Sequence, residues 1–291
     1  MDKLIFDSYA KLNLYLSVLS LRKDKFHNIK TIFERINLSD RIILKTRRDN
    51  KIKIISNSFR IPKDSSNLAY RSARLIQDKL GVNRGVDIKI IKRIPIGAGL
   101  GGGSSDAAGV LVGLNKLWKL KLNREKLVTL AKCIGSDVPF FIYNISFAEG
   151  LGRGEIIKPL KALKYTKFWH ILIIPKIEVS TPLVYKKCDE YLRLTKPRCN
   201  VKILSSALKK KDIPSTGKAL FNSLEEITVR LYPEVARIKE KLVDLGLKAV
   251  LMSGSGPAVF AIIASRREGQ TLRRRLKREH RSWQVFVAQT V

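Results

Sequence analysis

The sequence contains few of the residues that build disulfide frameworks or metal centres. It has three cysteines and three histidines among 291 residues, and no two cysteines are spaced as CxxC. An odd number of cysteines cannot all pair within one chain, and no histidine lies four residues from another metal ligand. These absences argue against a disulfide-stapled secreted domain and a structural zinc site, and they predict a protein of a reducing compartment.

Long apolar runs are also absent. No stretch approaches the roughly 18 residues needed to span a bilayer, and Asp2, Asp7 and Lys11 interrupt the segment where a signal-peptide core would lie. We therefore expect a cytoplasmic protein that does not enter a membrane. Hydrophobic residues make up 45% of the chain and are spread along it, which is enough for two cores, so we expect two lobes.

Acidic residues are scarce relative to basic ones. The chain carries 57 Lys and Arg against 25 Asp and Glu, a net charge of +32. Clustered basic residues can neutralise nucleic-acid phosphates, so one interpretation is a nucleic-acid-binding protein. The basic residues are scattered, however, with short runs at 209–211 and 273–275 and no interleaved aromatics. The favoured interpretation is a solvated basic surface that holds nucleic acid only non-specifically.

Hydrophobic periodicity predicts short strands and amphipathic helices in the first half of the chain. Apolar and polar residues alternate from Leu4 to Leu19, which indicates a bent strand or a hairpin. Asn67 is a suitable N-cap for a helix that ends at Leu80, before Gly81. Further strands are expected at 41–46, 51–56 and 86–92, and a further helix from about 104 to 117.

The second half has the element order of a split βαβ, ferredoxin-like lobe. Strands are expected at 169–174, 249–252, 258–264 and 283–288, with helical segments after the first and a basic helix before the last. The glycine-dense segment 150–154 is either a turn within the first lobe or the hinge between the lobes. We place the boundary slightly after it, which gives lobes of residues 1–158 and 159–291.

A glycine-rich segment lies between an expected strand and an expected helix. Five glycines occur in the seven positions 97–103, and a backbone without Cβ atoms can turn several N–H groups toward one anion. The following helix N-terminus adds unpaired donors, and its serines can cap the helix or bind phosphate. The segment lacks the ending of a Walker A loop, so it predicts another kind of phosphate cradle or, alternatively, a flexible hinge. This glycine loop and its flanks comprise Pro95, Gly97, Ala98, Gly99, Leu100, Gly101, Gly102, Gly103, Ser104 and Ser105.

Three motifs, in order along the chain, resemble those of the GHMP kinases. They are the segment 8–14, the glycine loop and the segment 251–260. The resemblance implies an α+β, two-lobed GHMP kinase fold, with an N-terminal lobe like the second domain of ribosomal protein S5 and a ferredoxin-like C-terminal lobe. It also implies that the glycine loop binds ATP and that catalysis uses Mg2+, whose protein ligands the sequence does not reveal.

Four shorter segments, 10–14, 26–27, 135–141 and 179–182, resemble one branch of this family. That branch phosphorylates the 2-hydroxyl of a cytidine diphosphate-linked methylerythritol in the non-mevalonate isoprenoid pathway. Such a reaction needs a proton acceptor and a cation, and the resemblance implies Asp137 as the general base with Lys11 holding it ionised. The alternative for Asp137 is a helix cap before Val138, whereas Lys11 lies inside an apolar strand where a surface lysine is not expected.

The same resemblance implies the residues that bind the substrate. His27 can both donate and accept at a cytosine edge, although a turn histidine is the alternative. Phe26 and Tyr185 are similar to the aromatic pair that stacks on cytosine, with Phe replacing the more common Tyr and Lys25 replacing the usual glycine. The turn 254–256 is implied at the substrate diphosphate, unless it is an ordinary hairpin turn. The implied set is Asn13, Phe26, His27, Thr181, Tyr185, Gly254, Ser255 and Gly256.

Three other interpretations stay open at this level. The chain could be a GHMP kinase for another small alcohol, or a basic RNA-binding protein on the same fold. It could also be a non-catalytic family member, although the presence of Lys11 and Asp137 argues against this. The expected partner is a small-molecule substrate, and the expected state is a monomer or a homodimer.

Overall fold

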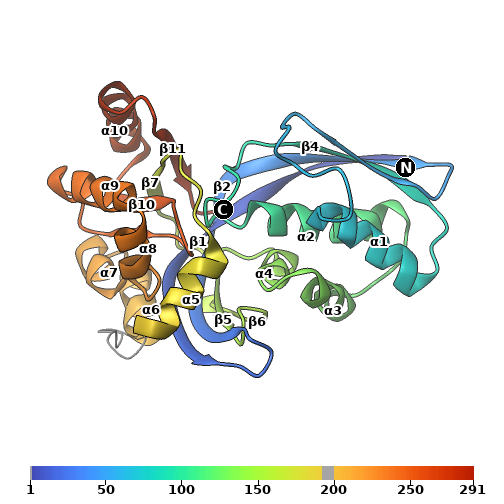
Figure 1. The fold of residues 1–291 in the computed structure, drawn as a ribbon, viewed down its shortest axis with the longest axis horizontal. Helices are drawn as coiled ribbons and strands as arrows, with labels where there is room; N and C mark the ends of the chain where they lie inside the picture. The colour runs from blue at the N-terminus through green and yellow to red at the C-terminus, as the bar shows by residue number, and fades with distance from the viewer. Residues whose placement is uncertain (1, 192–199) are drawn as a thin grey trace.

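The structure is a computed structural model that describes residues 2–191 and 200–291, and it confirms a mixed α+β fold with two lobes (Figure 1). The first lobe contains β1 (Lys3–Leu21), β2 (His27–Arg47), β3 (Ile52–Ser56), α1 (Leu68–Leu80), β4 (Gly85–Ile91), α2 (Gly102–Leu117), α3 (Arg124–Ile134), α4 (Val138–Tyr143), β5 (Phe147–Leu151) and β6 (Ile156–Pro159). The 3-10 helix η1 (Lys161–Leu163) follows. The second part contains β7 (Trp169–Ile174), α5 (Thr181–Tyr191), α6 (Val201–Lys210), α7 (Ile213–Ala219), β8 (Phe221–Asn222), α8 (Glu225–Leu231), α9 (Pro233–Asp244), β9 (Val250–Met252), β10 (Val259–Ile263), α10 (Arg266–Glu279) and β11 (Gln284–Gln289).

A long antiparallel pair, β1 with β2, organises the first sheet. The strand order is β3-β4-β2-β1-β8, and β5 pairs with β2 and with β6. The expected alternatives of a bent strand or a hairpin at 4–19 resolve into one strand, whose register shifts near Tyr9, Asn13 and Val18 are where bulges bend it. The strand expected at 41–46 is the end of β2, which begins at His27 because residues 27–40 also pair with β1.

The middle of β1 is buried on both faces. Residues 10–18 are all buried, although the ends of the strand are partly exposed. One core combines β2 and β4 with the helices α1 to α4, and another combines the middle of β1 with β7 and β10 of the second lobe. Burial therefore does not alternate in this segment, although apolar and polar residues do, because a strand between two lobes has no solvent face. Polar residues there, such as Lys11 and Asn13, become interior groups.

The helix that begins at Leu68 follows its local signals closely. The Asn67 side chain accepts a hydrogen bond from the Ala69 amide, and Gly81 closes the helix in a left-handed conformation with φ of 62°. Helix α2 starts at Gly102, two residues earlier than expected, with Gly101 at the N-cap and no side-chain cap. The suggestion that Ser104 or Ser105 caps this helix is therefore wrong, because both lie inside its first turns.

The second sheet has the ferredoxin-like order β11-β7-β10-β9, with every pair antiparallel. The strands expected in the second half are present with ends that differ by one or two residues. Along the chain, helices α5 to α9 follow β7 and precede β9, and α10 connects β10 to β11. The basic helix expected before the last strand is α10, and the ferredoxin-like topology is confirmed.

The second half of the chain also returns to the first sheet. Strand β8 pairs in parallel with β1 at Tyr15 and Leu16, and Thr290 forms an isolated bridge with Ile36. The glycine-dense segment 150–154 is the turn between β5 and β6, so it belongs to the first lobe. The boundary at 158/159 lies at the end of β6 and stays a prediction.

Two findings concern the absences noted in the sequence. In residues 2–191 and 200–291, no helix is long and apolar enough to cross a membrane. Cys133 is exposed and Cys188 is buried, whereas Cys199 lies outside the described residues.

Candidate active site

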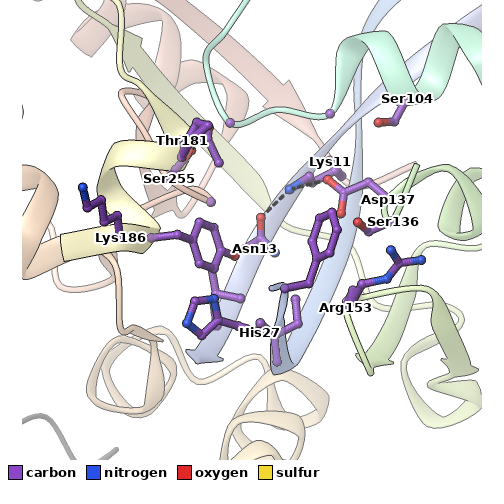
Figure 2. A pocket seen from close by; sticks show the side chains of 18 of the residues that line it. Lys11, Asn13, His27, Ser104, Ser136, Asp137, Arg153, Thr181, Lys186 and Ser255 are labelled. Carbon is purple, nitrogen blue, oxygen red and sulfur yellow. Dashed lines mark hydrogen bonds and ion pairs between the residues drawn. The ribbon is translucent and has the colours of Figure 1, made fainter. Parts of the chain in front are cut away.

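A cleft of about 700 Å3 lies where the two lobes meet, and Figure 2 shows the side chains around it. Its walls come from β1, the turn after it, the glycine loop, the segment before α4, the first turn of α5 and the turn between β9 and β10. The residues that line this interlobe cleft are Lys11, Asn13, Leu16, Leu21, Lys25, Phe26, His27, Ile29, Gly99, Gly101, Ser104, Ser136, Asp137, Arg153, Thr181, Pro182, Tyr185, Lys186, Gly254 and Ser255.

Lys11 brings a buried ammonium group into the cleft. Only 4% of the residue is exposed, because β1 is covered on both faces at this point. Its Nζ lies 2.5 Å from Asn13 Oδ1 and 3.2 Å from Asp137 Oδ2. A desolvated charge is costly unless it has such partners, so these contacts hold the ammonium in one place.

The orientation of Asn13 is set by its neighbours. Its Nδ2 donates to Thr31 Oγ1 at 2.9 Å, and the Thr31 hydroxyl in turn donates to the Tyr15 carbonyl at 2.6 Å. Because the amide nitrogen is used on this side, the amide oxygen faces Lys11. A short chain of hydrogen bonds between β1 and β2 thus prepares an acceptor for the ammonium.

Asp137 lies at the position that precedes α4, but its side chain does not cap that helix. The structure has no cap hydrogen bond at this terminus, and the carboxylate instead reaches Lys11. The side chain remains 30% exposed, so one side of it faces the cleft. The capping alternative for Asp137 is therefore wrong. The geometry suits a carboxylate that accepts a proton from a group bound in the cleft.

The glycine loop approaches both Lys11 and the turn between β9 and β10. Gly101 has φ of +67°, and a Cβ there would lie 2.9 Å from Lys11 Cγ and 3.1 Å from the Phe141 ring. Gly99 has φ of +74°, and a Cβ there would lie 2.2 Å from the Ser253 carbonyl oxygen. These two positions need glycine for both conformation and space. The Lys11 amide also donates to the Leu100 carbonyl at 2.9 Å, which ties the loop to β1.

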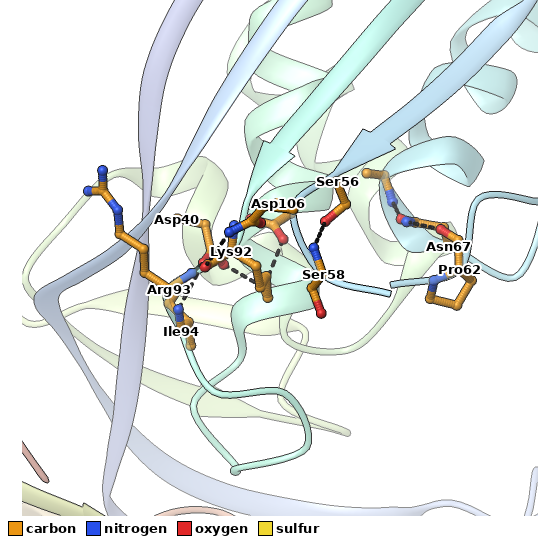
Figure 3. Close-up of polar contacts among 11 residues, drawn as sticks. Asp40, Ser56, Ser58, Pro62, Asn67, Lys92, Arg93, Ile94 and Asp106 are labelled. Atoms are coloured by element: carbon orange, nitrogen blue, oxygen red, sulfur yellow. Dashed lines mark hydrogen bonds and ion pairs between the residues drawn. The ribbon is translucent and has the colours of Figure 1, made fainter. Parts of the chain in front are cut away.

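A buried cluster of three charges secures the base of the glycine loop (Figure 3). Lys92 Nζ lies 2.5 Å from Asp40 Oδ2 and 3.0 Å from Asp106 Oδ2. Asp40 Oδ1 also accepts hydrogen bonds from the backbone amides of Arg93 and Ile94, immediately before the loop. The cluster thus joins β2, the segment entering the loop and the first turns of α2.

The charges of this cluster do not balance, which changes its protonation. Two carboxylates and one ammonium would leave a net negative charge in the interior. Burial raises the pKa of the Asp106 carboxyl to about 7, although the Lys92 charge opposes the shift. Burial lowers the pKa of the Lys92 ammonium, but the charges of Asp106 and Asp40 outweigh it and raise that pKa overall. The Asp106 carboxyl therefore changes its protonation state near neutral pH.

The turn between β9 and β10 is held against the glycine loop by hydrogen bonds. Ser253 Oγ donates to the Gly99 carbonyl at 3.1 Å and accepts from the backbone N–H of Asn13 at 3.2 Å. Asn222 Nδ2 donates to the carbonyls of Met252 and Gly254, each at 2.8 Å. The turn therefore faces the cleft as a fixed wall, beside the loop and the first strand.

Aromatic side chains form the other end of the cleft. The rings of His27 and Tyr185 lie 5.4 Å apart with an angle of 30° between their planes, and His27 is 7% exposed. Phe26 is 52% exposed, and the Arg153 guanidinium lies 4.9 Å from the centre of its ring. Burial, and then the negative charge of Asp137, raise the pKa of the Tyr185 phenol, so this hydroxyl stays protonated.

Comparison with protein families agrees with this arrangement. The model of the GHMP kinase N-terminal domain matches residues 67–144, and the model of the GHMP kinase C-terminal domain matches residues 204–282. The chain belongs to the GHMP kinase family. The two matches lie in the two lobes and include the glycine loop and the segment 251–260, so the resemblance to this family is confirmed.

Several relatives of this GHMP kinase share one name. A protein from Geobacillus sp. (strain WCH70), named 4-diphosphocytidyl-2-C-methyl-D-erythritol kinase, is 44% identical over 263 residues, which cover 90% of this chain and 88% of the relative. A protein of the same name from Shouchella clausii (strain KSM-K16) is 45% identical, covering 87% and 84%. A crystal structure of 4-(cytidine 5'-diphospho)-2C-methyl-D-erythritol kinase has a TM-score of 0.83 at 34% identity and covers 98% of both chains.

In this GHMP kinase, the cleft brings together residues from all three sequence motifs. Predicted residues that line it are Lys11, Asn13, Phe26, His27, Gly99, Gly101, Ser104, Asp137, Thr181, Tyr185, Gly254 and Ser255. Eight predicted residues do not line it: Pro95, Gly97, Ala98, Leu100, Gly102, Gly103, Ser105 and Gly256. Ala98 and Leu100 belong to the loop but are buried, and Ser105 lines a different cavity. The individual roles of all these residues stay predictions.

Sequence reasoning missed several groups in the cleft. Arg153 lies in the turn between β5 and β6, and Lys186 follows Tyr185 in α5. The glycine-dense segment around Arg153 was a signal, but its position beside Phe26 depends on how β5 pairs with β2. Nothing in a basic chain distinguishes Lys186 from its many other lysines. Both add positive charge to a site predicted for anionic ligands.

Proposed function

We propose that this chain transfers the γ-phosphoryl group of ATP to the 2-hydroxyl of 4-diphosphocytidyl-2-C-methyl-D-erythritol, giving the 2-phosphate and ADP. The observation that carries the proposal is the ion pair between the buried Lys11 and the partly exposed Asp137 beside the glycine loop, in a cleft whose other end is aromatic. The name shared by relatives that are 44% and 45% identical supports the choice of substrate.

The chemistry assigned to the pair is proton transfer from the substrate alcohol. The Asp137 carboxylate accepts the proton of the attacking hydroxyl as its oxygen bonds to the γ-phosphorus, and the bond from that phosphorus to the β,γ-bridging oxygen breaks, so that this oxygen leaves with ADP. The Lys11 ammonium, fixed by Asn13, stabilises the ionised carboxylate and the negative charge of the transferring group. Because both groups are positioned before the substrate arrives, little reorganisation is needed during the reaction.

The glycine loop is the proposed site of the ATP phosphates. Its positive-φ glycines leave the backbone open to a close approach, and α2 begins immediately after it. Ser104 adds a hydroxyl that faces the cleft. The connection from Asp40 through Lys92 to Asp106 keeps the two ends of the loop at a fixed separation.

The aromatic end of the cleft is the proposed site of the cytosine. Tyr185 and Phe26 offer ring faces, and His27 offers a ring nitrogen to the base edge. Arg153, Lys186 and the turn at Gly254 and Ser255 also line the cleft, and we assign these four residues to the substrate diphosphate. This assignment adds Arg153 and Lys186 to the residues implied by family resemblance.

Magnesium is part of the proposal because ATP phosphates need a counterion in phosphoryl transfer. Mg2+ is usually held by the phosphates, water and one or two protein oxygens, and it does not need a cage of side chains. Within residues 2–191 and 200–291, no three His, Cys, Asp or Glu side chains form a group that could hold a metal. The Ser104 hydroxyl and the Asp137 carboxylate are two of the side-chain oxygen groups that line the cleft.

The test of the proposal is ADP release by the purified protein with Mg-ATP and each of several alcohols. We expect turnover with the cytidylyl substrate and a product heavier by one phosphoryl group in mass spectrometry. Homoserine, mevalonate and galactose serve as comparison substrates for other members of the family. A folded protein that turns over one of these and ignores the cytidylyl compound would contradict the proposed substrate, and salt-sensitive RNA binding without turnover would favour the RNA-binding interpretation.

A further inference from the structure

A second cavity, of about 370 Å3, lies beside the first half of β1 and shares no lining residue with the interlobe cleft. Its walls are β1, one face of α2, the end of α4 and a single residue of β2. The residues that line it are Leu4, Ile5, Phe6, Asp7, Ser8, Tyr9, Arg35, Ser105, Ala108, Gly109, Val112, Gly113, Lys116, Phe141, Ile142 and Asn144. Its volume is within the range of small-ligand sites, roughly 300 to 1,000 Å3.

The cavity exists because one face of α2 carries small side chains. Ser105, Ala108, Gly109 and Val112 follow the three- and four-residue spacing of a helix face, so together they present a shallow wall. A Cβ at Gly109 would lie 2.6 Å from the Phe6 ring, so the ring rests directly on the helix backbone. The space beside the ring is left unfilled by protein.

Arg35 places a positive charge at this wall without a matching negative one. The residue is only 8% exposed, and its guanidinium donates to Asn144 Oδ1 and lies over the Tyr9 ring. In the part of the chain that the structure describes, no carboxylate forms an ion pair with it, and its Nε is buried without a hydrogen bond partner. Burial lowers the pKa of this guanidinium, and the Tyr9 phenol opposes the shift without reversing it.

A buried, unpaired guanidinium is costly, since arginine does not release its proton in proteins. The other charged groups at the cavity do not provide a countercharge. Asp7 lines the cavity, but its carboxylate pairs with Arg41 at 3.1 Å, and Lys116 adds a second positive charge at the exposed rim. The cavity is therefore an apolar space with a positive electrostatic environment.

We propose that this second cavity binds a small amphipathic anion, with its apolar body against Phe6, Val112 and Phe141 and its negative group toward Arg35. Such a ligand would bury apolar surface and supply the missing countercharge together. The same ligand would touch α2 and α4, the helices that follow the glycine loop and Asp137. This site is independent of the proposed substrates, because the two cavities have no residue in common.

The test is calorimetric titration of the full-length protein with octanoate, and with octanol and octylammonium as neutral and cationic analogues of the same length. We expect octanoate to bind at least about tenfold more tightly than either analogue, the ratio that one charge-assisted hydrogen bond gives. Saturating ATP or CDP should leave octanoate binding unchanged, since neither reaches this cavity. Equal affinity for the three analogues, or displacement of octanoate by either nucleotide, would overturn the proposal.

Two variants locate the bound probe. Arg35→Gln keeps a hydrogen bond donor for Asn144 but removes the charge, and it should weaken octanoate binding about tenfold or more. Val112→Phe points from a half-buried position into the cavity and should abolish binding with an unchanged circular dichroism spectrum. Arg153→Gln, in the interlobe cleft, is the matched control. If Arg153→Gln weakens octanoate binding while Arg35→Gln does not, the anion occupies the cleft and the second cavity is not its site.

Discussion

Lys11 Nζ lies 3.2 Å from Asp137 Oδ2 and 2.5 Å from Asn13 Oδ1, so one ammonium group joins the first strand of the protein to a carboxylate more than a hundred residues away. This fixed geometry depends on the burial of Lys11, because an ion pair that is fully exposed to water is weak and is not held in one arrangement. In the cleft it orients the carboxylate before any substrate binds. Substitution of a residue of this pair should therefore lower kcat while leaving the Michaelis constants of the substrates nearly unchanged.

Replacing the carboxylate tests the proposed base directly. Asp137→Asn keeps the shape of the side chain but removes its capacity to take up a proton, so kcat should fall by roughly a hundredfold or more. The Michaelis constants of both substrates should change little, since the amide still fills the site. Steady-state ADP release measures both quantities. Asp78→Asn, on the exposed face of α1, is the control, and a loss of less than about tenfold in Asp137→Asn would exclude Asp137 as the base.

The close approach of Gly101 to Lys11 predicts a different defect. In Gly101→Ala, the new Cβ would lie 2.9 Å from Lys11 Cγ, so the lysine must move and kcat should fall by about tenfold or more. Backbone strain alone is controlled by Gly81→Ala, because Gly81 has a similar φ of +62° but nothing within 4 Å of the added atom. Both variants should lose about 1 to 2 kcal/mol of unfolding free energy. Equal kcat values in the two would show that the contact with Lys11 has no catalytic consequence.

Stacking at the aromatic end predicts a change in substrate binding without a change in ATP binding. Tyr185→Ala removes one ring, and base stacking contributes about 1 to 3 kcal/mol, so the Michaelis constant for the cytidylyl substrate should rise by a factor between about 5 and about 150. The Michaelis constant for ATP should stay the same. Tyr185→Phe should restore binding because the ring face is retained, and Tyr165→Ala serves as an exposed aromatic control. A parallel rise in the Michaelis constants for the cytidylyl substrate and for ATP would show that the cytosine does not stack on Tyr185.

Protonation of the cluster beneath the glycine loop predicts how stability depends on pH. The Asp106 carboxyl has its pKa raised to about 7 in the folded protein, against an ordinary value of 3.8, so folding takes up a proton between these values. The protonated Asp106 carboxyl therefore makes its full contribution to the free energy of unfolding below about pH 4, and this contribution is lost as the pH rises through 7. Urea unfolding should show the wild type losing a few kcal/mol relative to Asp106→Asn between about pH 5 and pH 8. Asp78→Asn, in which an exposed carboxylate is removed, should run parallel to the wild type.

Local signals predicted much of the fold. The helix from Leu68 to Leu80 could be placed at both ends because an asparagine cap and a left-handed glycine are properties of the chain itself. The element order of the second half was sufficient for the ferredoxin-like sheet. The two-lobed architecture came from the resemblance of three motifs, since periodicity alone does not say how two sheets meet.

Other features depend on packing that the sequence does not encode locally. The length of β2 was underestimated because residues 27–40 form a strand through their pairing with β1. Arg153 reaches the cleft only through the pairing of β5 with β2. The cluster of Asp40, Lys92 and Asp106 brings together residues from three elements, and each alone resembles a surface charge in a chain with a net charge of +32.

The parallel pairing of β8 with β1 has a consequence for how the molecule comes apart. A strand that belongs to both cores cannot leave one without opening the other, so the two lobes should melt in a single cooperative transition. The first 158 residues expressed alone would present the free edge of β1 and an uncovered apolar face, which are features of aggregating chains. Each half of the protein therefore protects the other from self-association, quite apart from any contribution to the chemistry.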